Sequence, residues 1–200
     1  MKILHVGATG HVGEPVGAAL RERGHDVVSA HRSSADRPVD ITDPESVRAL
    51  YDTVGPGLDA VVVTAGTTPY APWDEIGREQ LLAGLTSKFL GQVELVRQGV
   101  GFVREGGSFT LTSGILGREP VRTGSVAAAV NGALEGWVPA TAGELWGRFR
   151  VNVVSTTVLT ESRAAYSSVM PGYPAVDGSE VGLAYVRSVE SMDSGRVYVL

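Results

Sequence analysis

The sequence of 200 residues contains no cysteine and only two lysines, Lys2 and Lys88. Without cysteine the chain cannot form a disulfide, a thiolate metal site or a cysteine nucleophile, and we expect a cytoplasmic protein. The 17 basic residues are outnumbered by 22 acidic ones, and no basic run could follow a phosphate backbone. A nucleic-acid partner is therefore not expected.

Long apolar runs are also missing. The N-terminal run reaches glycine at Gly7, which is too short for a signal peptide or for the roughly 20 residues that span a bilayer. No group of His, Asp and Glu has metal-ligand spacing, and no membrane contact is expected. With 43% hydrophobic and 20% charged residues, the composition predicts one folded domain over residues 1–200.

Short apolar runs alternate with segments whose apolar residues recur at helical spacing. We interpret the runs as strands, at Ile3–Val6, Val27–Ala30, Val39–Ile41, Leu58–Thr64, Ser108–Leu111, Val151–Val154 and Val197–Leu200. The helical segments are 11–23, a segment after Asp43-Pro44, 79–96, 127–146 with Pro139 as a potential break, and 181–189. This alternation predicts an α/β fold, a Rossmann-type doubly wound parallel sheet of about seven strands with helices on both faces.

A glycine turn follows the first strand, as Gly7-Ala-Thr-Gly10-His-Val-Gly13. Glycines at such a turn let the backbone approach a pyrophosphate, whose charge is favoured by the free N–H groups of the helix that follows. A plain tight turn is the alternative, but the strand before the turn and the helix after it favour a dinucleotide site.

The second predicted strand ends at Ala30-His31-Arg32-Ser33, where NAD sites usually carry an acidic residue. Here Arg32 could hold a 2′-phosphate with Ser33 as a hydrogen-bond donor, so NADP(H) is favoured over NAD(H). The alternative for Arg32 is a solvated loop charge.

Taken in order, several motifs resemble those of the short-chain dehydrogenase/reductase family over nearly the whole chain. Besides the glycine turn, they are Asp40-Ile41, Thr64-Ala65-Gly66, Ser113, Asn131-Gly-Ala-Leu-Glu-Gly136 and Arg150-Val-Asn-Val-Val-Ser155. The resemblance implies Ser113 as a catalytic residue and a homodimer or homotetramer built on the helices around Lys88 and 127–137. Together with the glycine turn, it implies a cofactor site made of Gly7, Thr9, Gly10, His11, Val12, Gly13, Arg32, Ser33, Asp40, Ile41, Thr64, Ala65, Gly66, Asn131 and Thr156.

The chain departs from this family at the residues that transfer the proton. The family uses a Tyr four residues before a Lys, because the ammonium lowers the pKa of the phenol. The aligned positions hold Ala127 and Asn131, and neither Lys2 nor Lys88 is predicted to substitute. Thr86 stands where the family has its catalytic Asn. The sequence therefore predicts an atypical active site.

Other residues could face the substrate, but each is more readily explained by packing or surface exposure: Glu161, Tyr70, Tyr166 and Tyr173. Ser113 could bind a substrate carbonyl or serve only in a turn before Gly114. Three functions stay open. The favoured one is an NADP(H)-dependent oxidoreductase acting on a small carbonyl or alcohol substrate. The others are a non-redox enzyme on the same scaffold and a catalytically silent protein that senses dinucleotides or binds a partner.

Overall fold

A computed structural model describes residues 1–200, and its centre is a parallel sheet of six strands. The strand order is β2-β1-β3-β4-β5-β8, so the chain starts in the interior of the sheet and winds outward in both directions. The strands are β1 (Lys2–Val6), β2 (Asp26–Ala30), β3 (Leu58–Val63), β4 (Val103–Thr112), β5 (Arg150–Ser155) and β8 (Val197–Val199). The predicted doubly wound α/β fold is confirmed.

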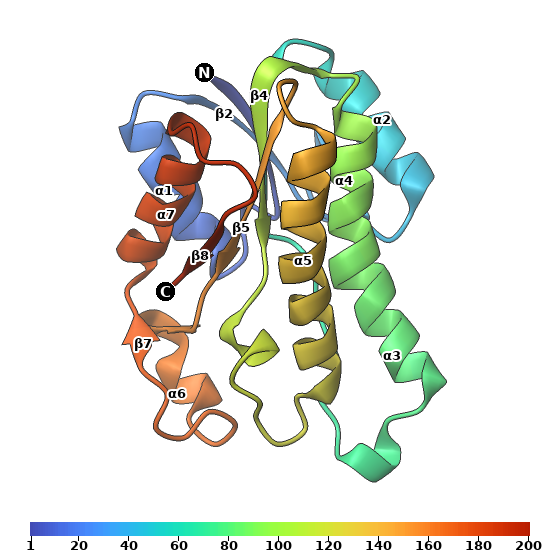
Figure 1. Cartoon of the computed structure of the whole chain (residues 1–200), viewed down its shortest axis with the longest axis vertical. Coiled ribbons are helices and arrows are strands. Elements are labelled where there is room, and N and C mark those ends of the chain that lie inside the picture. Colours follow the sequence, from blue (N-terminus) through green and yellow to red (C-terminus); the bar gives the residue numbers. More distant parts are fainter.

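Helices cover both faces of the sheet (Figure 1). On one face, α1 (Gly13–Glu22) packs against α7 (Gly178–Glu190). The other face carries α2 (Pro44–Val54), α4 (Gly91–Gly99) and α5 (Ser125–Glu144). The remaining elements lie toward the carboxyl ends of the strands, namely α3 (Arg78–Gly84), α6 (Arg163–Tyr166) and the small parallel pair of β6 (Val158–Leu159) and β7 (Ala175–Val176).

Each face of the sheet has its own hydrophobic core. The larger core joins the sheet to α2, α4 and α5 around fully buried residues such as Tyr51 and Phe109. The second core joins it to α1 and α7 around Leu20 and Tyr185. The central strands are apolar on both sides, as the run Val61–Val63 in β3 shows, and this is the pattern of a sheet covered on both faces.

The strand predicted at Val39–Ile41 does not form, so the main sheet has one strand fewer than expected. Val39 and Ile41 are buried as strand residues would be. However, the Asp40 amide donates to Ser46 Oγ, and the Asp40 carboxylate accepts from Thr42. These bonds engage the backbone locally, and β2 is left as the edge of the sheet.

The helix predicted over 79–96 is present but not uniform. Between α3 and α4, residues Leu85–Leu90 form a π-helical turn, which is wider than an α-helical turn. By contrast, Pro139 lies inside α5 and does not end it. None of the helices combines the length and the apolar character needed to cross a membrane.

Candidate active site

A pocket of about 530 Å³ opens beyond the carboxyl ends of the strands. In an open parallel sheet, this edge is where ligands bind. Eleven of the residues predicted for the site line the pocket together, namely Gly7, Thr9, Gly10, His11, Val12, Thr64, Ala65, Gly66, Ser113, Asn131 and Thr156. The structure therefore brings the glycine turn and the predicted catalytic serine to one cavity.

The glycine turn is packed so closely that two of its glycines, Gly7 and Gly13, leave no room for a side chain. Gly7 has φ +92°, and a Cβ there would lie 2.6 Å from the Ala65 nitrogen. A Cβ at Gly13 would overlap the carbonyl oxygen of Gly7. The amides of His11 and Val12 at the start of α1 have no acceptor within the chain, so they are free to bind an anion.

His5 supports this turn from inside the sheet. Its Nε2 lies 2.9 Å from Thr64 Oγ1, and that hydroxyl is 3.0 Å from the Gly7 carbonyl oxygen, to which it can donate. Burial, together with the charge of Arg21, lowers the pKa of His5 to about 4. His5 is therefore neutral at pH 7 and acts as a donor that fixes Thr64 between β3 and the turn.

The other five predicted residues lie outside the pocket lining. Gly13 lies under the turn, and Ile41 packs against Gly91. Arg32 is three-quarters exposed, with Nη2 3.4 Å from the Asp40 carboxylate, and Ser33 Oγ is 3.3 Å from His31 Nδ1. Arg32, Ser33 and Asp40 thus form a polar surface past the end of β2.

The hydroxyl of Ser113 is held by a carboxylate that the sequence analysis did not single out. Ser113 Oγ donates to Glu135 Oε1 over 2.8 Å, and Ser155 Oγ donates to the same oxygen over 2.7 Å. The second oxygen of Glu135 is paired with Arg118. Glu135 lies one helical turn after Asn131 in α5, so its position on the same face was a usable signal.

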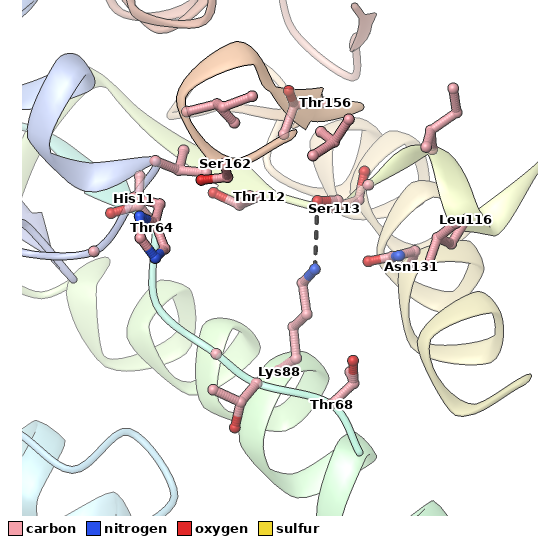
Figure 2. A pocket seen from close by; sticks show the side chains of 18 of the residues that line it. His11, Thr64, Thr68, Lys88, Thr112, Ser113, Leu116, Asn131, Thr156 and Ser162 are labelled. Atoms are coloured by element: carbon pink, nitrogen blue, oxygen red, sulfur yellow. Dashed lines mark hydrogen bonds between the residues drawn. The ribbon is translucent and has the colours of Figure 1, made fainter. Parts of the chain in front are cut away.

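Lys88 lines the pocket, so the prediction that it is not placed at the site is wrong for this residue. Its Nζ donates to the Ser113 carbonyl oxygen over 3.4 Å, and Figure 2 shows the side chain reaching across the cavity toward Ser113. Lys88 belongs to the π-helical turn, whose altered phase a regular helical pattern does not predict. Lys2 begins β1 at the opposite edge, and its Nζ donates to the Val54 carbonyl oxygen.

Comparisons with known proteins decide the family. A family model described as enoyl-(acyl carrier protein) reductase matches residues 12–199. The chain belongs to the short-chain dehydrogenase/reductase family. Protein lin1944 from Listeria innocua, a solved structure, is 36% identical with a TM-score of 0.96, over 100% of this chain and 99% of that one. A comparison with curated protein sequences finds no match.

Two other similar structures contain a nucleotide. A small-chain dehydrogenase in complex with NADPH is 27% identical, with a TM-score of 0.87 over 100% of this chain and 96% of that one. A short-chain dehydrogenase from Burkholderia cenocepacia J2315, in complex with NADP, is 21% identical with a TM-score of 0.84 over 99% and 95%. The latter supports the fold alone.

The tyrosines of this short-chain dehydrogenase/reductase do not approach Ser113 as Lys88 does. Tyr70 and Tyr166 line the outer part of the pocket, and each is at least 40% exposed. Burial of part of its ring raises the pKa of Tyr70, which makes its phenol a weaker acid. Tyr173 donates to the Glu119 carbonyl oxygen, and Glu161 accepts from the Gly178 amide at the start of α7. The last two are therefore structural.

The donors and acceptors in the pocket fit a dinucleotide. The Oδ1 atom of Asn131 and the Oγ atom of Ser162 are buried without a hydrogen-bond partner, although both residues line the cavity. A buried polar atom without a partner costs free energy, and a ligand hydroxyl or amide would remove that cost. The sequence motifs predict Asn131 at the position of the family's lysine, and an asparagine can hydrogen-bond a ribose hydroxyl without supplying a charge.

Proposed function

We propose that this protein is an NADP(H)-dependent oxidoreductase that acts on a small carbonyl or alcohol substrate through a non-standard active site. The observation that carries the proposal is the single pocket shared by the glycine turn, Ser113 and the unpartnered Oδ1 of Asn131. When bound, a nicotinamide dinucleotide would supply or accept a hydride. The NADPH complex of the 27% identical dehydrogenase supports this choice of cofactor.

The two ends of the pocket would bind different parts of the dinucleotide. The amides of His11 and Val12 would hold the pyrophosphate at the N-terminus of α1. Asn131 and Thr156 would bind the ribose and the nicotinamide end, beside Ser113. Ser113 faces this end with its proton already donated to Glu135, so its oxygen can accept a hydrogen bond from an alcohol. To donate to a carbonyl instead, the hydroxyl must first turn away from Glu135.

The preference for NADP(H) depends on Arg32. Its guanidinium is exposed and paired only with Asp40 at 3.4 Å, a long contact that a phosphate could replace. A phosphate carries more charge than a carboxylate and binds a guanidinium with two parallel hydrogen bonds. Ser33, next in the chain and also exposed, would add a neutral donor.

Cofactor fluorescence titration tests the preference. Arg32→Ala should weaken NADPH binding by roughly 1 to 3 kcal/mol and leave NADH binding nearly unchanged. Arg48→Ala is the matched control, because Arg48 is also exposed and paired with an aspartate, but on α2. Equal affinity of the wild type for both cofactors, unaffected by Arg32→Ala, would contradict the NADP(H) preference.

A turnover screen on carbonyl compounds with NADPH separates the proposal from its alternatives. Slow reduction, in which nicotinamide absorbance falls with a matching amount of alcohol, supports an oxidoreductase. Tight NADPH binding without turnover would instead favour a catalytically silent dinucleotide-sensing protein. Conversion of substrate without a change in nicotinamide absorbance would favour a non-redox enzyme.

We further propose a homodimer in which the faces of α3, α4 and α5 pair with those of a second copy. Leu82 and Leu90 are about half exposed on the α3 and π-helical segments. On α5, Ala129, Gly132 and Gly136 face solvent, and a Cβ at either glycine would meet no neighbouring atom. Sedimentation of wild type and Leu90→Glu at micromolar concentration tests the assembly, and a monomeric wild type would contradict it.

A further inference from the structure

We propose that the ε-amino group of Lys88 is the proton donor and acceptor of this active site, in place of a phenol at position 127, where the chain has Ala127. The inference rests on the proposed oxidoreductase function. Under this proposal Lys88 exchanges a proton with the substrate directly. It projects from the π-helical turn, whereas the positions expected for the family's Tyr and Lys lie in α5. A structural lysine that only ties the π-helical turn to the end of β4 is the competing explanation.

The backbone around Lys88 directs the side chain into the cavity. The π-helical turn presents Lys88 to the end of β4, where Nζ is 3.4 Å from the Ser113 carbonyl oxygen. Gly66, with φ +121°, provides the space: a Cβ there would lie 2.9 Å from both Cα and Cγ of Lys88. Figure 2 shows the amine pointing toward Ser113, with Asn131 to the right of it and His11 and Thr64 farther away on the left.

The hydrogen bonds of the amine leave it available to a ligand. A lysine that only bridges two elements usually pairs with a carboxylate, since an ammonium has three protons to donate. Lys88 makes no ion pair, and its only side-chain hydrogen bond is the 3.4 Å contact with one carbonyl oxygen. The nearby carboxylate of Glu135 is instead bound to Ser113, Ser155 and Arg118. Two protons of the ammonium therefore remain free toward the pocket.

The surroundings poise this amine for proton transfer near neutral pH. Burial lowers the pKa of Lys88 to about 8, while the negative charge of Glu135 opposes that shift. The other titratable groups around the pocket are His11 at the glycine turn, Tyr70 and Tyr166 at the rim, and Arg118 beyond Glu135. A general acid works best when its pKa lies close to the operating pH.

The proton and electron balance is simple. In the reducing direction, a bound reduced nicotinamide would supply a hydride to the carbonyl carbon, and the π electron pair of the carbonyl would move to its oxygen. The Lys88 ammonium gives that oxygen a proton, which yields the alcohol, and the neutral amine recovers a proton from solvent at the pocket mouth. In the oxidising direction, the neutral amine removes the proton of the alcohol.

Direct titration tests the inference without any turnover, because the chain has only two lysines. Protein labelled with [13C]lysine should give two lysine ε-carbon signals in NMR spectra, and Lys2→Arg assigns them. We expect the Lys88 signal to titrate near 8, well below the ordinary value of about 10.4 for a lysine side chain. A Lys88 signal that titrates near 10.4 would overturn the inference.

Stability distinguishes a site lysine from a structural one. Because the pKa of Lys88 is lower in the folded protein, the charged form opposes folding fully below pH 8, and this penalty disappears above about pH 10.5. Lys88→Met should therefore raise Tm at pH 7 by roughly 2 to 8 °C, with the gain shrinking at alkaline pH. A lower Tm at pH 7 would indicate a structural lysine and contradict the inference.

Kinetics complete the test with Lys88→Arg, which keeps the charge but does not titrate near neutral pH. We expect a loss of about 10²- to 10⁴-fold in kcat, an NADPH Kd within a few-fold of wild type, and no alkaline limb near pH 8 in the reduction profile. Lys2→Arg should behave as wild type. An unchanged pH profile in Lys88→Arg would overturn the role of Lys88, whereas failure of the wild type to bind NADPH would overturn the proposed function instead.

Discussion

The two halves of this short-chain dehydrogenase/reductase preserve their family pattern to different degrees. In the first half, from β1 to β3, the glycine turn and Thr64-Ala65-Gly66 meet in one tight arrangement. In the second half, Ala127 and Asn131 stand at the positions where the sequence motifs predict the family's Tyr and Lys, and Lys88 enters the pocket from another helix. Backbone that must approach a pyrophosphate cannot tolerate extra atoms, whereas an amine on a long side chain can reach the same space from several elements.

The sharpest test of the rigid half compares two glycines in one turn. Gly13→Ala should lower the unfolding free energy by roughly 3 kcal/mol or more, because its Cβ would overlap the Gly7 carbonyl. Gly10→Ala should fold normally, since the nearest atom to its Cβ is 3.6 Å away. However, its methyl group would face the pocket and should weaken NADPH binding at least tenfold.

Urea denaturation and cofactor fluorescence measure the two effects. If Gly10→Ala bound NADPH as well as wild type, close approach of the backbone at Gly10 would not be needed. The two halves would then differ less in how strictly they constrain their residues than we infer.

His5 allows the same half to be tested by pH. Because its pKa falls from 6.5 to about 4 on folding, the unfolded chain takes up a proton first, and stability is lost as pH falls from about 6.5 to 4. The loss should reach about 3 kcal/mol, at 1.36 kcal/mol for each pKa unit. His5→Gln removes the titrating group but retains a donor for Thr64, so it should flatten this part of the stability profile. An equally steep profile in His5→Gln would show that other groups cause the acid sensitivity.

Glu135→Gln should give the smallest of these effects, in the second half. A neutral amide cannot accept from Ser113, Ser155 and Arg118 at once, so we expect a loss of about 1 to 2 kcal/mol in unfolding free energy. The pKa of Lys88 should fall further below 8, since the carboxylate that favours its ammonium is gone. The lysine NMR titration measures this shift, and a rise in that pKa would contradict the placement of Glu135.

Much of the fold follows from local patterns that the sequence displays. The run Leu58–Thr64 includes the buried β-branched residues Val61–Val63, and it forms a central strand with helices on both sides. Val39–Ile41 alternates apolar and polar residues but forms no strand: the Asp40 amide donates to Ser46 Oγ, and the Asp40 carboxylate accepts from the Thr42 amide. Side-chain competition of this kind depends on how the loop folds and is not visible in the hydrophobic pattern.

The sequence predicted the parts of the site that the backbone forms, but not the parts that depend on where side chains point. The glycine turn and Ser113 lie where their motifs placed them relative to strand ends. Lys88 was misjudged because the π-helical turn changes which residues face inward. Ala127 is 1% exposed against Ile115 and Leu116, so a tyrosine there would need repacking that an alignment does not reveal.

The absence of a strand at Val39–Ile41 also bears on aggregation. With that strand missing, β2 presents its outer backbone groups along an edge, where another chain could pair with it. The edge is only five residues long, and Asp26 at its start is exposed. The segment that follows carries three charged residues, Arg32, Asp36 and Arg37, and then Pro38, which has no backbone N–H to donate. Both features oppose pairing with another strand. The same loop that we propose binds a cofactor phosphate would thereby also keep neighbouring molecules from extending the sheet.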